Sequence, residues 1–154
     1  MDSHVNVVVE GEAGSLARLA SVLECLMQAP PAGELDEACE LAWRGRLPGW
    51  LVSQFASEAS AAESRAWLNG WRRASAAKRA EMEDEAGWEL LDWLYWFSSD
   101  NEFWHLIDFS RSKDREMIVL LATADDCTPM KAIEWLVEKS GAEITSIDRR
   151  GDYL

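Results

Sequence analysis

The sequence predicts an α+β fold in which a four-stranded antiparallel sheet carries helices on one face. Two segments rich in apolar and β-branched residues, 4–10 and 117–123, are typical of strands, and each precedes a segment with helical periodicity. A long segment rich in Ala, Glu, Leu and Trp lies between the two halves and predicts a helical insertion. The 154 residues suit a single domain, residues 1–154, with a conventional core.

Residues 4–29 predict one strand followed by one helix. A β-branched run with alternating faces ends at Gly11 and predicts the strand. Ser15 is the expected N-cap of the helix, and Pro30-Pro31 ends it. The residues that carry the two patterns are Val5, Val7, Val9, Leu16, Leu19, Ala20, Leu23, Leu26 and Met27.

Residues 103–123 predict two strands joined by a turn. Alternation over residues 103–109 predicts the first strand, and the polar stretch from Ser110 to Asp114 predicts the turn. The second strand, residues 117–123, has apolar residues on both faces, which is typical of a central strand.

A helix and a short strand complete the pattern. Thr128 is the expected N-cap, Pro129 the first helical residue and Gly141 the end of the helix. Residues 142–148 predict the last strand. The order β-α followed by β-β-α-β is the ferredoxin-like plan, with both helices on one face of a four-stranded antiparallel sheet.

Residues 34–98 form the expected Trp-rich helical insertion after the first helix. The segment is too long for a simple connection and too apolar for a flexible linker. Pro48-Gly49 and Gly87 are the expected breaks between helices. The four predicted helices cover about 35–44, 48–58, 60–84 and 86–98.

The charge of the chain argues against nucleic acid or an anionic membrane as a direct partner. The formal net charge is −13, with 15 basic and 28 acidic residues. Residues 64–80 hold five basic residues and no acidic one, whereas residues 81–108 hold nine acidic residues and no basic one. Within the insertion we expect the pairs Lys78–Glu81 and Arg79–Glu83. Neither a membrane-spanning run nor a targeting segment is recognisable, so we expect a cytoplasmic protein.

Nine tryptophans are the most unusual feature of the sequence, and seven of them lie in or at the edge of the insertion. Between Trp88 and Phe97 apolar groups point in nearly every helical direction, so this helix is either buried on all sides or exposes an aromatic patch. Because tryptophans also anchor protein interfaces, both alternatives stay open. For Trp67 and Trp71 the i, i+4 spacing favours packing in the core.

No residue pattern in the sequence indicates a particular reaction, a cofactor or a metal site. Three cysteines and two histidines at irregular spacing do not form a zinc motif, and no phosphate loop or nucleophile motif is present. Cys25 is expected to pack as a small apolar residue, and His105 is expected to be buried with its hydrogen bonds satisfied. Acidic clusters such as Asp125-Asp126 and Glu83 to Glu85 favour a solvated or protein-binding face over catalysis.

Both ends of the chain resemble the YubB-type ferredoxin-like domain of plasmid and phage proteins. The resemblance rests on Asn6 to Gly11, on the helix from Leu16 to Met27, and on the segment from Ala122 to Gly141 with its Pro-opened helix, about half of the chain. The Asn-Trp-Gly and Trp-Ser-Pro-Pro signatures of that family are absent. The resemblance implies an origin in a mobile genetic element and supplies no catalytic residues.

These features predict a non-enzymatic inhibitor protein that binds and blocks a basic nucleic-acid-processing enzyme or complex. Its carboxylates would stand in for phosphates, as in an anti-CRISPR or other anti-defence protein of a phage or plasmid, or in an immunity protein against a nuclease toxin. The alternative is a small-ligand or metal-dependent enzyme on the open face of the sheet. The expected partner-binding residues are Glu81, Glu83, Asp84, Glu85, Glu89, Asp92, Trp96, Asp100 and Glu102.

Overall fold

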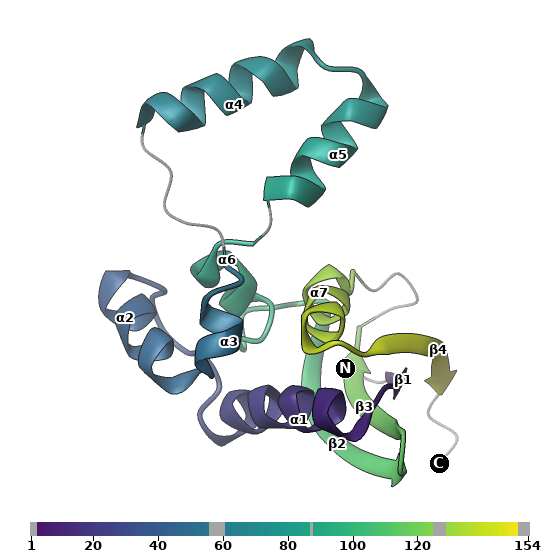
Figure 1. The fold of residues 1–154 in the computed structure, drawn as a ribbon. Coiled ribbons are helices and arrows are strands. Elements are labelled where there is room, and N and C mark those ends of the chain that lie inside the picture. Colours follow the sequence, from purple (N-terminus) through teal and green to yellow (C-terminus); the bar gives the residue numbers. More distant parts are fainter. Residues whose placement is uncertain (1–2, 56–60, 87, 125–128, 151–154) are drawn as a thin grey trace.

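The computed structural model describes residues 3–55, 61–86, 88–124 and 129–150 as an α+β fold with one four-stranded antiparallel sheet (Figure 1). The elements in chain order are β1 (Ser3–Glu10), α1 (Ala13–Gln28), α2 (Glu37–Arg46), α3 (Gly49–Val52), α4 (Ala61–Arg73), α5 (Ala76–Ala86), α6 (Leu90–Tyr95), β2 (Trp104–Lys113), β3 (Glu116–Thr123), α7 (Lys131–Ser140) and β4 (Glu143–Arg150).

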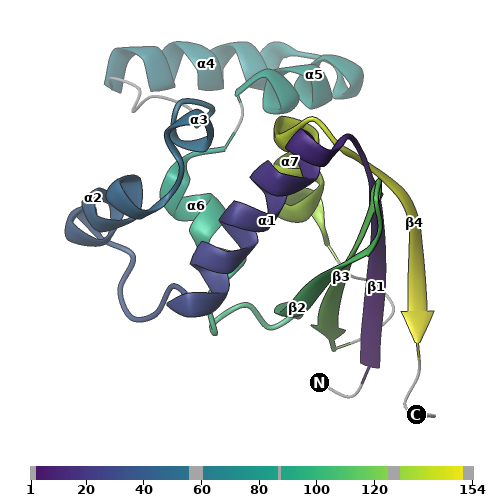
Figure 2. The ribbon, with the colours of Figure 1, turned by 60° about the horizontal axis from the view of Figure 1, so that its bottom comes forward.

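The sheet has the strand order β2-β3-β1-β4, and every neighbouring pair is antiparallel. Helices α1 and α7 contact each other and lie on the same side of the sheet (Figure 2). They cover the face that carries Val5, Val7 and Val9, each at most 1 % exposed. This alternation is the one that the first apolar run predicts, and it places the core between the sheet and the two helices.

Two predicted strand ends came too early, one by four residues and one by two. Strand β2 continues to Lys113, so the turn consists of Asp114 and Arg115 and does not begin at Ser110. Side-chain hydrogen bonds hold this polar end of the hairpin: the Arg111 guanidinium donates to the Asp114 carbonyl at 2.8 Å, and Ser112 Oγ donates to Glu116 Oε1 at 2.7 Å. The last strand likewise extends past its predicted end, to Arg150.

Two predicted helix starts were also wrong. Helix α1 begins at Ala13, so Ser15 is inside the helix, where it is buried and accepts a hydrogen bond from Arg18. Helix α7 begins at Lys131, two residues after Pro129. The Pro129 carbonyl accepts a hydrogen bond from the Trp104 indole at 2.7 Å, a tertiary contact that the local sequence does not encode. Thr128, the predicted N-cap, lies outside the described residues.

The end of α7 is confirmed at Gly141, which has φ of +92°. The Gly141 and Ala142 amides donate to the carbonyls of Glu138 and Val137, as in a Schellman cap. We expect Gly141→Ala to lower the free energy of unfolding by about 1–2 kcal/mol or more, because a left-handed residue with a Cβ is strained. The added Cβ would also lie 2.9 Å from Ser15 Oγ.

Chemical denaturation measures this cost, and Gly45→Ala is the matched control. Gly45 lies in α2, and a Cβ there would meet no heavy atom within 4 Å. Because alanine is a better helix former than glycine, the control should leave stability unchanged or raise it by roughly 0.5–1 kcal/mol. Equal losses for the two variants would contradict the assignment of a strained cap.

The insertion is helical, as predicted, and much of it is core. Trp43 and Trp93 are 3 % and 0 % exposed and belong to the same hydrophobic cluster as Val7 of the sheet. The predicted helix over 48–58 is shorter, because α3 ends at Val52, and residues 56–60 lie outside the described part. The predicted helix over 86–98 is confined to the six residues of α6.

The predicted single helix over residues 60–84 is two helices, α4 and α5, that form a hairpin (Figure 1). Ser75 Oγ accepts a hydrogen bond from the Lys78 amide, which starts α5. The Arg79 guanidinium donates to the carbonyls of Trp71 and Arg72 at the end of α4, and lies 4.3 Å from the centre of the Trp71 ring. These side chains therefore form hydrogen bonds with backbone amides and carbonyls that have no partner within a helix where one helix ends and the next begins.

The hairpin stands away from the sheet and its covering helices (Figure 1). The predicted core position of Trp67 is therefore wrong: its side chain is 39 % exposed, and Trp71 is half-buried under Arg79. The predicted pair Lys78–Glu81 forms, with 3.4 Å between Nζ and Oε2. The side chain of Glu83, the predicted partner of Arg79, lies outside the described part.

Candidate protein-binding surface

Three aromatic side chains gather on the surface between α6 and β2. Tyr95 and Phe103 are 39 % and 45 % exposed, and Trp96 is half-buried between them. The ring centroids of Tyr95 and Trp96 are 5.8 Å apart, and those of Trp96 and Phe103 are 6.0 Å apart. We name these three residues the aromatic cluster. Trp93, one helical turn earlier, points into the core instead.

Two buried polar residues fix the turn that presents the aromatic cluster. Asn101 is 1 % exposed; its Nδ2 donates to the Trp96 carbonyl at 2.8 Å, and its Oδ1 accepts from the Phe103 amide at 2.9 Å. Ser98 Oγ donates to the Tyr95 carbonyl at 2.7 Å and accepts from the Asp100 amide. A surface held in place in this way loses little conformational entropy when it binds a partner.

Ser98 and Asn101 were not predicted from the sequence as residues that support this site. Their signal in the sequence is the polar run from Ser98 to Asn101 after an apolar helix, which is typical of a turn with side-chain hydrogen bonds to the backbone.

Exposed carboxylates accompany the aromatic cluster. Glu89, Asp92, Asp100 and Glu102 are all exposed, and within the described part of the chain none of them forms an ion pair. Residues 81–108 contain no basic residue that could neutralise them locally. The segment therefore combines apolar anchors with uncompensated negative charge.

The predicted binding residues are not one continuous group. Glu81 lies on α5, in the separate hairpin, and pairs with Lys78. The side chains of Glu83, Asp84 and Glu85 lie outside the described residues. The residues that the fold brings to the α6–β2 segment are Glu89, Asp92, Trp96, Asp100 and Glu102.

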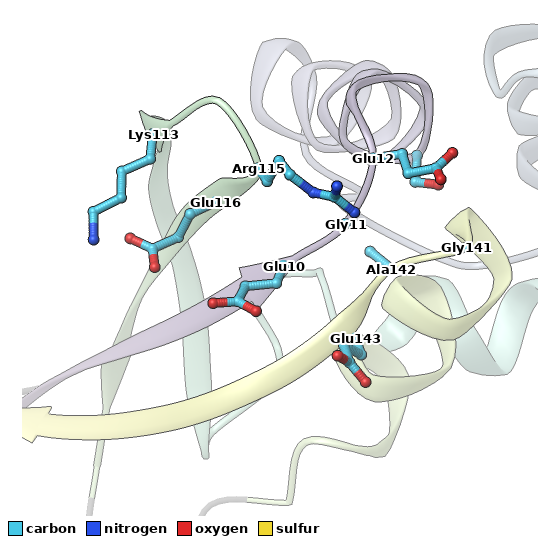
Figure 3. Close-up of a pocket in the computed structure, with 10 residues that line it drawn as sticks. Glu10, Gly11, Glu12, Lys113, Arg115, Glu116, Gly141, Ala142 and Glu143 are labelled. Carbon is cyan, nitrogen blue, oxygen red and sulfur yellow. The ribbon is translucent and has the colours of Figure 1, made fainter.

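A pocket of about 640 Å³ opens at the other end of the sheet, where β1, β3 and β4 approach their connecting turns (Figure 3). Its charged lining consists of Glu10, Glu12, Glu116, Glu143, Lys113 and Arg115. Four carboxylates against two cations do not favour a phosphate group. In the described ranges no three Asp, Glu, His or Cys side chains are arranged to hold a metal ion.

The prediction that His105 is buried with its hydrogen bonds satisfied was wrong. The residue is half-buried, and its Nε2 has no hydrogen-bond partner among the residues that the structure describes. It lines a smaller pocket of about 280 Å³ together with Leu26, Met27 and Phe97. Cys25 is half-buried against the core, as predicted, and Cys127 lies outside the described residues.

Within the described ranges, no helix is both long enough and apolar enough to cross a membrane. No family model, no curated protein and no solved structure matches the chain.

Proposed function

We propose that this protein is a non-enzymatic inhibitor that binds and blocks a basic nucleic-acid-processing enzyme or complex. The observation that carries the proposal is the aromatic cluster, held rigidly by Asn101 and accompanied by Asp100 and Glu102 in a segment without basic residues. Aromatic side chains are the usual anchors of protein interfaces, and carboxylates around them complement a surface that normally binds phosphates.

The proposed contact residues lie in the segment 89–103, with Trp96 as the anchor and the acidic residues Glu89, Asp92, Asp100 and Glu102 as the rim. Rim charges mainly speed the encounter of two proteins and give less of the final affinity. Two biological settings fit this chemistry equally: a phage or plasmid anti-defence protein, such as an anti-CRISPR, and an immunity protein against a nuclease toxin. In either setting we expect action in the cytoplasm, where such enzymes work.

We further propose that β1, α1, β2, β3, α7 and β4 form a ferredoxin-like unit of the YubB type, with α2 to α6 inserted after its first helix. The supporting observations are the β-α-β-β-α-β order outside the insertion, the antiparallel pairing and the two helices on one face. The proposal on binding does not depend on this assignment, because fold alone does not give function.

Affinity capture from the host, followed by identification of the retained protein and an assay of its activity, tests the proposed function. We expect a basic nucleic-acid-binding enzyme that loses activity when the purified inhibitor is added. The inhibitor alone should not shift DNA or RNA in a gel at about 150 mM salt, because non-specific binding to phosphates needs clustered cations. Turnover that is lost on chelation with EDTA would support the enzyme alternative instead.

Charge reversal separates rim contacts from the anchor. We expect Asp100→Lys and Glu102→Lys each to slow association with the captured partner and to weaken its salt dependence, at a cost of roughly 0.2–1 kcal/mol in affinity. Stopped-flow kinetics at several ionic strengths measures the effect. Glu138→Lys changes the net charge equally in the last turn of α7, close to Gly141 and the pocket at the other end of the sheet, and should leave the association rate nearly unchanged. Equal slowing by all three variants would indicate a general effect of net charge.

A further inference from the structure

The second face of the sheet carries an apolar strip that no described helix covers. In β1 and β3, residues alternate between the buried face and this open face, where Val8, Ile118 and Leu120 are half-buried. Helices α1 and α7 pack on the opposite face, against Val5, Val7 and Val9. We name Val8, Ile118 and Leu120 the open-face strip.

The open-face strip departs from the pattern of a sheet that meets water on one side. Such strands alternate between apolar residues inside and polar residues outside, whereas the open face of β3 carries Ile118 and Leu120, and that of β1 carries Val8 next to them. The other residues on the open face of β1, His4, Asn6 and Glu10, are polar. The register places Val8 directly opposite Ile118, with Leu120 two residues further along β3. The three side chains are therefore neighbours, and they form a continuous apolar centre.

Acidic residues border this centre on two sides. At one end the register places Glu10 directly opposite both Glu116 of β3 and Glu143 of β4, so three carboxylates lie in a row across the sheet. Figure 3 shows these three side chains along the ends of neighbouring strands. On the outer strands, Asp108 pairs with Leu120 and Asp148 pairs with Asn6.

Like charges directly opposite each other destabilise a sheet. The row of Glu10, Glu116 and Glu143 therefore costs stability in the isolated protein. Lys113, opposite Glu116, and Arg115, which lines the same pocket, offset part of that cost. Cations brought by a partner would remove this repulsion on binding. An apolar centre with a polar rim is also the anatomy of a protein interface.

We propose that the open face of the sheet is a second docking surface, and that it receives a basic partner whose apolar residues contact the open-face strip while its Lys or Arg side chains face the glutamate row. This inference rests on the proposed function and names a further surface for the same class of partner. A second copy of the chain fits less well, because each copy carries a net charge of −13 and the same acidic border.

The test uses the full chain labelled with ¹⁵N and a defined probe, an acetylated and amidated peptide of Leu-Lys-Lys-Leu repeats. Such a peptide forms a helix with an apolar stripe bordered by lysines. The matched peptide replaces each lysine with glutamate. We expect the lysine peptide, and not the glutamate peptide, to shift the backbone amides around Val8, Ile118 and Leu120.

Variants assign the shifts to the strip. Ile118→Thr combined with Leu120→Thr places β-branched threonine at both positions, on a face outside the core, so the sheet should still form. We expect this double variant to weaken peptide binding by about tenfold or more. Leu41→Ala, which removes a 74 % exposed leucine from α2, is the control and should not change the affinity.

Four other outcomes of this experiment would overturn the inference. Shifts confined to residues 89–103 would leave the proposed function standing and exclude the open face as its contact. Equal binding of both peptides would show that the face binds apolar residues whatever their flanking charge, and would exclude a basic partner as its specific occupant. A concentration-dependent dimer that the double threonine variant abolishes would assign the face to a second copy. An absence of any shift would exclude the open face, whereas only the capture experiment decides the proposed function.

Discussion

Replacing Trp93 with alanine is expected to lower the free energy of unfolding by about 3–5 kcal/mol, the largest loss that we predict for a single substitution. The Trp93 side chain is 0 % exposed and contacts the rings of Phe55, Phe97 and Trp135 at centroid distances of 5.3, 4.6 and 6.0 Å. Its indole also donates a hydrogen bond to the Ala132 carbonyl at 3.1 Å. The variant leaves a cavity and an acceptor without its donor.

Equilibrium denaturation followed by circular dichroism measures this loss. Trp67→Ala is the matched control, because it removes the same side chain from α4, where it is 39 % exposed. We expect the control to cost about 1 kcal/mol or less, the usual range for surface positions. If the two variants lost equal stability, Trp93 would not be the link between the insertion and the rest of the core.

Trp96→Ala is expected to weaken binding of the captured partner by about 2 kcal/mol or more, roughly 30-fold. Trp96 lies at the centre of the aromatic cluster, between Tyr95 and Phe103. The hydrogen bond that Asn101 donates to residue 96 uses the backbone carbonyl, so alanine retains it. Because the ring is only half-buried, we expect a smaller loss of stability than for Trp93→Ala.

Affinity and melting temperature, measured on the same Trp96→Ala sample, separate the two roles of the ring. Trp96→Phe is the control that keeps an aromatic group in the cluster, and it should retain most of the affinity. A loss of about 3–5 kcal/mol in stability, with affinity unchanged for the folded fraction, would assign Trp96 to the core and remove it as an anchor.

Local patterns in the sequence determined which elements form. Alternating valines predicted β1, helical spacing predicted α1, and Gly141 marked the end of α7, because each of these depends on backbone geometry over a few neighbouring residues. The α+β class, the four-stranded antiparallel sheet and the helical character of the insertion follow from such patterns. The excess of acidic residues over 81–108 is likewise a property of the sequence alone.

Tertiary structure alone decided which side of each element is covered. Trp67 and Trp93 both lie in apolar helical patterns, yet the first is on a hairpin that stands away from the sheet and the second is in the core. Leu120 lies in a run that is apolar on both faces, and the helices cover only the face opposite to it. Periodicity shows which residues share a face, but only long-range packing determines what that face meets.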